Sequence, residues 1–325
     1  MEEIACIFCG KINAAIVIEE NGYTGRECAE CGLIYISPRP SLTEVLGLYQ
    51  QNAAYVSAEA HISSGFAKRL YARHNLKIIT SLVKSGAVLE IGAGAGYFLD
   101  EARKIGFDPY GIEFNPIQAN FIRNELKIPC EESPLSASSF EGQSFAVIYH
   151  CDVVSHFFDP ISEFETMRQR ISEGGFLIFE TGNLAEVNRK YYRYFPRFQY
   201  PDHLFFFSLN SVKMLLEKTG FEFVAVYRYS ILPQLWLRQA LLSGKRLVFG
   251  ARPSSGGDDT AHSAQVGTSG RNAVAPASTD MSAAARKFAR IGYSTLNYLI
   301  RYKIGRIVPK AQRPQTMIVI ARKRE

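Results

Sequence analysis

The stretch VLEIGAGAGYFLDEARKIG, residues 88–106, contains the strongest fold signal in this chain. It starts with β-forming residues, places glycine at positions 92, 94 and 96, and continues into a helical pattern. A glycine-rich turn between a strand and a helix brings bare backbone close to a bound ligand. The spacing of the three glycines then indicates which ligand the turn fits.

A dinucleotide needs the spacing G-x-G-x-x-G, because its pyrophosphate rests on the N-terminus of the helix. Here the third glycine comes one residue early, and the bulky Tyr97 stands at the sixth position. S-adenosylmethionine has no phosphate; it needs open backbone beside its amino-acid end and a carboxylate near its cationic centre. The glycine pattern therefore favours S-adenosylmethionine.

The sequence at this point resembles the class I S-adenosylmethionine-dependent methyltransferases, over residues 65–231 and 315–322. VLEIGAGAGYF matches the first motif of that family, and YGIEFNP (110–116) matches the end of its second strand. The resemblance implies that Glu113 binds both ribose hydroxyls, since each carboxylate oxygen accepts one O–H. It also implies an acidic residue beside the adenine, at Glu131 or Glu132. The implied donor-binding residues are Glu90, Gly92, Gly94, Gly96, Glu113, Glu132 and His150.

Four cysteines near the N-terminus form two pairs with a two-residue spacer, each followed by glycine. This spacing lets both sulfurs of a pair face one ion, and tetrahedral Zn²⁺ takes four thiolates. The segment between the pairs predicts a short hairpin that turns near Asn21-Gly22. We expect a zinc ribbon whose site is structural, because four protein ligands leave no open position. The predicted ligands are Cys6, Cys9, Cys28 and Cys31.

Strand and helix patterns alternate along the rest of the chain, which predicts a parallel sheet covered by helices on both faces. The expected strands are 87–91, 108–113, 145–150, 175–181, 221–231 and 315–322. The expected helices are one that starts near Ser41, then 64–84, 95–105, 116–126, 160–172 and 208–219. We therefore expect an α/β fold, the Rossmann-like seven-stranded sheet of class I methyltransferases, preceded by the zinc ribbon.

The chain divides into a zinc ribbon (1–40), a helical lead-in or lid (41–85), a methyltransferase core (86–231 with 314–325) and an insertion (232–313). Within the insertion, residues 251–285 are small and polar, which predicts a disordered linker. Apolar and basic stretches flank it, and RKFARIGYSTLNYLIRYKIGRIV (286–308) has the pattern of a membrane-surface helix. The alternative is a pair of helices that pack against the core.

Charge is distributed unevenly along the chain. Residues 233–325 carry 16 Lys/Arg and 4 Asp/Glu, a surplus of +12, whereas the first 232 residues carry 21 and 27, or −6. A basic tail indicates an anionic partner such as phospholipid head groups; the alternative is a solvated tail. The chain has no bilayer-spanning apolar run and no secretory signal, so we expect a cytoplasmic protein, peripheral to the inner face of a membrane.

Two histidines and a tyrosine are the candidates for acceptor chemistry. The stretch FQYPDHLFFFSLNS (198–211) contains Tyr200 and His203, and DHLFFFS is similar to the EHLxYFS-type stretches of the family. His203 fits a general base near neutral pH, and a structural histidine is the alternative. His156 precedes Asp159-Pro160 as in many relatives, but Ser155 stands where they have glutamate.

A four-cysteine ribbon before this core is similar to sugar C-methyltransferases, although their usual C-terminal domain is absent. The resemblance implies a methyltransferase of a small molecule, a sugar or a lipid-linked glycan, acting on oxygen or carbon. An RNA methyltransferase is the alternative; nucleic acid is disfavoured because residues 1–232 are acidic. A non-catalytic scaffold that binds the donor is the third reading.

Overall fold

The computed structural model describes residues 1–12, 15–48, 52–136, 138–239, 283–307 and 312–324. At its centre lies a seven-stranded sheet in the order β10-β11-β8-β7-β4-β5-β6. The strands are β4 (Gly86–Ile91), β5 (Phe107–Ile112), β6 (Cys130–Glu131), β7 (Phe145–Cys151), β8 (Ile171–Gly182), β10 (Phe221–Ser230) and β11 (Gln315–Lys323). β11 runs antiparallel to both its neighbours, and the other pairs are parallel. The predicted fold class is confirmed.

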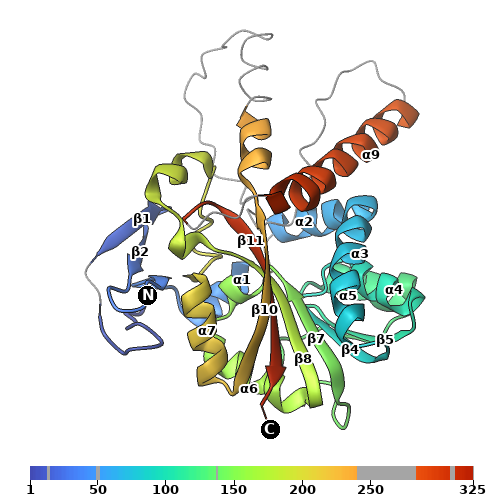
Figure 1. Cartoon of the computed structure of the whole chain (residues 1–325), viewed down its shortest axis with the longest axis horizontal. Coiled ribbons are helices and arrows are strands. Elements are labelled where there is room, and N and C mark those ends of the chain that lie inside the picture. Colours follow the sequence, from blue (N-terminus) through green and yellow to red (C-terminus); the bar gives the residue numbers. More distant parts are fainter. Residues whose placement is uncertain (13–14, 49–51, 137, 240–282, 308–311, 325) are drawn as a thin grey trace.

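Helices cover both faces of this sheet (Figure 1). One face carries α3 (Gly65–Leu82), α4 (Tyr97–Lys104) and α5 (Pro116–Phe121), which continues as η1 (Ile122–Leu126). The other carries α6 (Pro160–Arg170) and α7 (Leu209–Lys218). Asp159 caps α6 ahead of Pro160, and Ser208 caps α7 through a capping box with Ser211. These caps fix where the helices begin, because side-chain oxygens satisfy the first free amides.

The lead-in to the core contains one helix that the sequence patterns do not predict. α1 (Leu42–Leu48) begins at the expected capping box, in which the Ser41 amide donates to the Glu44 carboxylate at 2.8 Å. α2 (Asn52–Ser63) follows as a separate helix before α3. Its apolar residues do not form a stripe of helical period, so its sequence gives little sign of a packed face.

The N-terminal residues form a second sheet in the order β1-β2-β3-β9. β1 (Ile16–Glu20) and β2 (Tyr23–Glu27) are joined by Asn21 and Gly22, both with positive φ, as in the tight hairpin turn expected there. β3 (Ile34–Ile36) pairs with β9 (Phe205–Phe206), which belongs to the chain segment after β8. The ribbon and the core therefore share a sheet.

The described part of the insertion packs on the core. Residues 232–239 are helical. α9 (Ala283–Leu299) lies against α3 and continues as η5 (Ile300–Ile304) and η6 (Gly305–Ile307). The predicted linker 251–285 lies outside the described residues except for 283–285, which begin α9 instead. Within the described segments, no helix is both long and apolar enough to cross a bilayer.

Candidate active site

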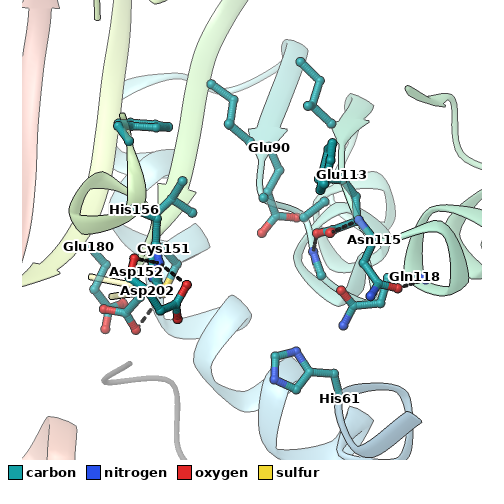
Figure 2. Close-up of a pocket in the computed structure, with 18 of the residues that line it drawn as sticks. His61, Glu90, Glu113, Asn115, Gln118, Cys151, Asp152, His156, Glu180 and Asp202 are labelled. Atoms are coloured by element: carbon teal, nitrogen blue, oxygen red, sulfur yellow. Dashed lines mark hydrogen bonds and ion pairs between the residues drawn. The ribbon is translucent and has the colours of Figure 1, made fainter. Parts of the chain in front are cut away.

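A cavity of about 680 Å³ opens where the strand order reverses, next to the C-terminal ends of β4, β5 and β7. Figure 2 shows two groups of polar side chains in it. One group, with Glu90 and Glu113, surrounds the glycine turn. The other, with His156 and Asp202, lies across the cavity. We call them the donor side and the acceptor side.

The glycine turn requires glycine at all three positions. Gly92, Gly94 and Gly96 have φ values of 67°, 56° and 68°, which other residues rarely adopt. A Cβ on Gly92 would lie 2.7 Å from Val153, and one on Gly96 would lie 2.7 Å from Ile122. At Gly94 the nearest atom would be 3.9 Å away, so this point of the turn borders open space. Gly92 and Gly96 serve packing, and Gly94 leaves room for a ligand.

Glu113, just beyond β5, braces the turn from one side. Its carboxylate accepts the amide of Gly94 at 2.6 Å and that of Asn115 at 2.8 Å. Burial raises the pKa of Glu113 to about 7, although these backbone amides oppose the shift. The carboxylate borders the cavity, so its remaining lone pairs can accept O–H groups of a ligand.

Glu90 lies at the end of β4, beneath the turn. Its side chain is buried, and Oε2 has no hydrogen-bond partner among the residues that the structure describes. Burial and the nearby Glu113 raise the pKa of Glu90 well above its ordinary value. A buried oxygen without a partner is costly unless a ligand supplies a donor. Together with the open space at Gly94, this fits a polar ligand such as S-adenosylmethionine.

Two residues predicted to bind the donor lie elsewhere. His150 is fully buried and stacks on Phe179 at 4.9 Å between ring centroids; it does not line the cavity. Along β7 alternate side chains face opposite ways, so Tyr149 and Cys151 line the cavity and His150 does not. Glu132 forms an ion pair with Arg123 at 2.9 Å and lies outside the cavity wall as well.

The donor side also contains residues that were not predicted from the sequence to bind the donor. Asn115 and Gln118 are buried along the cavity wall, and Ser133, Pro134 and Leu135 line it beyond β6. His61 of α2 points toward the turn (Figure 2). Asn115 lies within the recognised motif YGIEFNP and caps α5, which is a sequence signal for its position. His61 had no such signal, because α2 itself was not expected.

The acceptor side centres on His156, at the end of η2 (Val154–His156). Its Nδ1 lies 3.1 Å from the Asp202 carboxylate and 3.1 Å from the Asp202 carbonyl oxygen. Burial by itself would lower the pKa of His156, but the charge of Asp202 raises it above the ordinary value. Both residues line the cavity. A histidine held by a carboxylate has the arrangement of a general base.

His203 lies behind this pair, whereas Tyr200 is part of the cavity wall. His203 is buried outside the cavity wall, with its ring 4.5 Å from that of His156. Burial lowers the pKa of His203 to about 3, and neither ring nitrogen has a hydrogen-bond partner in the described segments. Tyr200 borders the cavity, but its hydroxyl lies against Gly25 of β2, where a Cβ would clash with it. His156 is therefore the histidine of this cluster that reaches the cavity.

The insertion supplies part of the cavity wall. Arg301 of η5 is 2% exposed and pairs with the Glu180 carboxylate near the end of β8. Asn75 of α3 donates to Glu180 at 2.9 Å and to the Tyr149 hydroxyl at 2.6 Å. Tyr302 lines the cavity beside them. Residues from three distant chain segments thus meet at this wall.

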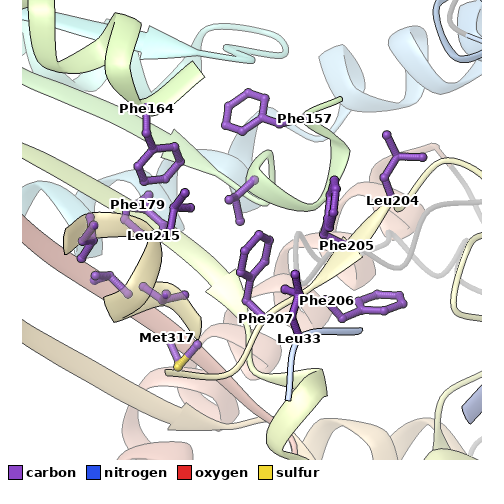
Figure 3. Packing of buried hydrophobic residues seen from close by; sticks show 14 of the residues in the cluster. Leu33, Phe157, Phe164, Phe179, Leu204, Phe205, Phe206, Phe207, Leu215 and Met317 are labelled. Carbon is purple, nitrogen blue, oxygen red and sulfur yellow. The ribbon is translucent and has the colours of Figure 1, made fainter. Parts of the chain in front are cut away.

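The hairpin turn of the ribbon holds the loop that carries Asp202. The Glu20 carboxylate accepts the amides of Phe198 and Tyr200, at 3.0 Å and 2.9 Å. Asn21 donates to the Tyr200 carbonyl at 2.7 Å. Leu33 of the ribbon packs in one apolar cluster with Phe205, Phe206 and Phe207, shown in Figure 3. The ribbon therefore positions the acceptor side of the cavity.

The four N-terminal cysteines lie near one another. The sulfur atoms of Cys6 and Cys31 are 3.5 Å apart, and those of Cys9 and Cys28 are 3.4 Å apart. Both pairs make the same turn, in which the glycine after the second cysteine has positive φ and donates to the carbonyl of the first. Cys6, Cys9 and Cys28 lie close enough to one another to share one ion, and the Cys31 sulfur lies beside that of Cys6. Thiolates are ligands that tetrahedral Zn²⁺ accepts.

The order of the seven strands, the glycine turn at the switch point and the carboxylate after the next strand define a class I S-adenosylmethionine-dependent methyltransferase fold. The family model described as a methyltransferase domain matches residues 64–226, half of the chain. The chain therefore belongs to this family of methyltransferase domains.

Individual relatives are more distant. A tRNA U34 carboxymethyltransferase of Helicobacter hepaticus is 33% identical over 109 residues, which cover 29% of this chain and 34% of that protein. The chain thus matches about a third of that relative's length. A phosphoethanolamine N-methyltransferase of Haemonchus contortus is 15% identical, with a TM-score of 0.42 over 78% of this chain and 53% of that one. N-methyltransferase NodS of Bradyrhizobium japonicum is 16% identical, with a TM-score of 0.39 over 50% and 79%.

Proposed function

We propose that this methyltransferase acts on a hydroxyl oxygen or a carbon of a small molecule, a sugar or the sugar of a lipid-linked glycan. The observation that carries this proposal is the His156–Asp202 pair on the wall of the cavity, opposite the glycine turn. A hydroxyl or a carbon is a poor nucleophile until it loses a proton, so it needs a base. A neutral amine is already nucleophilic and needs no base.

One set of residues would place the methyl donor, and another would remove a proton from the acceptor. S-adenosylmethionine, when bound, supplies a methyl group on a sulfonium, which is transferred by in-line displacement. Glu90, Glu113 and the Gly94 backbone would bind S-adenosylmethionine. Most of the rate enhancement would come from aligning the acceptor with the methyl group. His156 accepts the acceptor's proton at Nε2, while Asp202 holds Nδ1 and stabilises the imidazolium that forms.

Paired histidine variants test this assignment. We expect His156→Ala to lower kcat by about 10²- to 10⁴-fold, the usual contribution of a general base, with donor affinity unchanged. His203 lies behind His156 and does not line the cavity, so His203→Ala is expected to lower kcat less than His156→Ala does. If His203→Ala costs as much as His156→Ala while His156→Gln retains activity, the base is His203 instead. Isothermal calorimetry with the donor product identifies any variant whose donor side is damaged.

The acceptor class is tested with labelled methyl donor and fractionated cell extract. Label in a sugar-containing or glycolipid fraction is expected. Label found in RNA alone would contradict the proposal. RNA is the second candidate because the Helicobacter hepaticus relative is a tRNA-modifying enzyme. The cavity argues against it, since the described wall carries three Lys/Arg side chains and one of them, Arg301, is paired with Glu180, which leaves few cations for a polyanion.

A donor-binding scaffold without catalysis is the remaining alternative. A methyl group at Gly94 would point toward the cavity and would strain the backbone there. We therefore expect Gly94→Ala to weaken donor binding in calorimetry and to lower turnover in parallel. Donor binding without turnover on any fraction would favour the scaffold.

We also propose that Cys6, Cys9, Cys28 and Cys31 hold a structural Zn²⁺. The convergent sulfurs and the matching turns support it. The ion would order the ribbon, whose hairpin turn holds the Asp202 loop. Finally, we propose that residues 233–313 make peripheral contact with the anionic inner face of a membrane; the +12 surplus of residues 233–325 supports this placement.

A further inference from the structure

Helix α9 carries large apolar side chains on its outer face as well as on the side that packs against α3. Phe288, Leu296 and Leu299 are 73%, 46% and 42% exposed. At about 100° per residue they fall within roughly 80° of the helix surface, so they form one stripe. The other side packs Tyr298 against Tyr71 of α3 and leads into the buried Ile300. A helix that only packs on its own core places apolar residues inward, so this outward stripe calls for another apolar surface.

The segment that carries the stripe is rich in Lys and Arg. Residues 283–307 contain six Lys/Arg and no Asp/Glu. Lys303 and Arg306 are exposed just beyond the stripe, and Ile304 between them is 51% exposed. In the neighbouring helical segment 232–239, Gln234 donates to the Asn297 carbonyl at 3.5 Å, and Trp236 is 54% exposed. Exposed aliphatic and aromatic side chains among cations are typical of helices that lie in a lipid interface.

The position of α9 matches such a role. Its N-terminal part projects beyond α2 and α3, at the end of the molecule opposite the chain's C-terminus (Figure 1). Its other end continues into Arg301 and Tyr302, which line the cavity. One continuous element therefore presents an apolar stripe to the outside and completes the wall of the site.

We propose that the stripe Phe288, Leu296 and Leu299, with the flanking cations, docks α9 in the surface of an anionic phospholipid bilayer. Because the same element completes the cavity wall, docking brings the cavity to acceptors held at that surface. The link to a lipid-borne acceptor rests on the proposed function. Docking itself does not depend on methyl transfer, so the two are tested separately.

Co-sedimentation of the full-length protein with vesicles measures docking. We expect binding to phosphatidylcholine vesicles that contain phosphatidylglycerol, weak binding to phosphatidylcholine alone, and release by added salt. Replacing Phe288, Leu296 and Leu299 by serine is expected to lower vesicle binding by about tenfold or more. Lys303→Glu with Arg306→Glu is expected to weaken binding to the anionic vesicles only.

Matched control variants distinguish docking through α9 from non-specific binding to vesicles. Ile16, Ile105 and Val224 are exposed to 45%, 46% and 44% on other elements, and their triple serine variant is expected to bind vesicles normally. Lys84→Glu with Lys218→Glu is the charge control, since both lysines are exposed away from α9. Donor binding by calorimetry shows that each variant is folded.

Three outcomes would overturn docking. The stripe variant could bind vesicles as tightly as the unchanged protein. The two vesicle compositions could bind equally. Alternatively, light scattering could find a dimer that the stripe variant abolishes while neither protein binds vesicles, which would make a second copy the partner of the stripe. Normal docking together with absent sugar or lipid methylation would instead contradict the proposed function alone.

Discussion

Glu113 is the single side chain on which the donor side most depends. It accepts amides from both the glycine turn and the start of α5, and it borders the cavity. We expect Glu113→Ala to weaken donor binding by about 1.5–3 kcal/mol, the usual contribution of a charged hydrogen bond. Calorimetric titration with S-adenosylmethionine measures the change.

Glu132→Ala provides the comparison for this prediction. Glu132 pairs with Arg123 near the surface and does not line the cavity, so its removal is expected to leave donor affinity within about twofold. A large loss of affinity in Glu132→Ala would restore the sequence-based assignment of this residue to the adenine.

The pH dependence of turnover reports on His156. A base must be unprotonated, so activity falls as the pH drops through its pKa. Asp202 raises the pKa of His156 against the opposing effect of burial. Removing the charge in Asp202→Asn should therefore lower this pKa and move the acid limb of the kcat profile to lower pH. An unmoved acid limb would show that another group titrates.

At the scale of elements, the ribbon acts through its hairpin turn. Glu20 and Asn21 hold the loop that carries Asp202, and the cysteine turns hold the ribbon. We expect Cys9→Ser to lose zinc, measured by elemental analysis, and to lower kcat because the Asp202 loop is loosened. Donor affinity should stay near that of the unchanged protein, since no ribbon cysteine lines the cavity.

Cys130→Ser is the matched control for the ribbon. Cys130 is buried beside the donor side in β6, far along the chain from the cysteine turns. This variant should keep its zinc content. Equal zinc content in Cys9→Ser would contradict a four-thiolate site.

The elements that the sequence patterns missed are those that lack a periodic signal. α2 has no apolar stripe, and it brings His61 to the cavity. β9 is two residues long, and it exists because β3 of the ribbon pairs with it. Strands this short cannot be recognised by alternation, since period two needs several residues to be visible.

At the scale of the whole molecule, one buried ion pair ties the insertion to the core. Arg301 is 2% exposed and faces Glu180. Arg301→Met leaves that carboxylate buried without a counter-charge, and we expect a loss of about 3–5 kcal/mol in the free energy of unfolding. Denaturant titrations at several pH values measure this.

The sign of the pH dependence follows from Glu180. Burial raises the pKa of Glu180, and Arg301 opposes that rise. Without Arg301 the pKa rises further, so the loss of stability is largest at high pH and shrinks as falling pH protonates the carboxyl group. Arg301→Met with Glu180→Gln should recover most of the stability. Arg306→Met, at an exposed position, should cost little.

The sequence by itself determined the alternating strands and helices of the core, the glycine turn and the approach of the N-terminal cysteines, whereas the seven-stranded order and the role of Glu113 were expected from the family resemblance. The first three depend on local chemistry: alternation of element patterns, glycine at positive φ, and a two-residue spacer between cysteines. Such features can be read from neighbouring residues alone.

Only the tertiary structure decided which histidine reaches the cavity, that the ribbon holds the Asp202 loop, and that Arg301 completes the wall. These depend on residues far apart in the chain, such as Asn21 with Tyr200 and Glu180 with Arg301. His156 and His203 have similar sequence signals, and packing alone places one ring on the cavity and the other behind it. The direction of a side chain is set by what surrounds it, and a linear pattern does not contain that information.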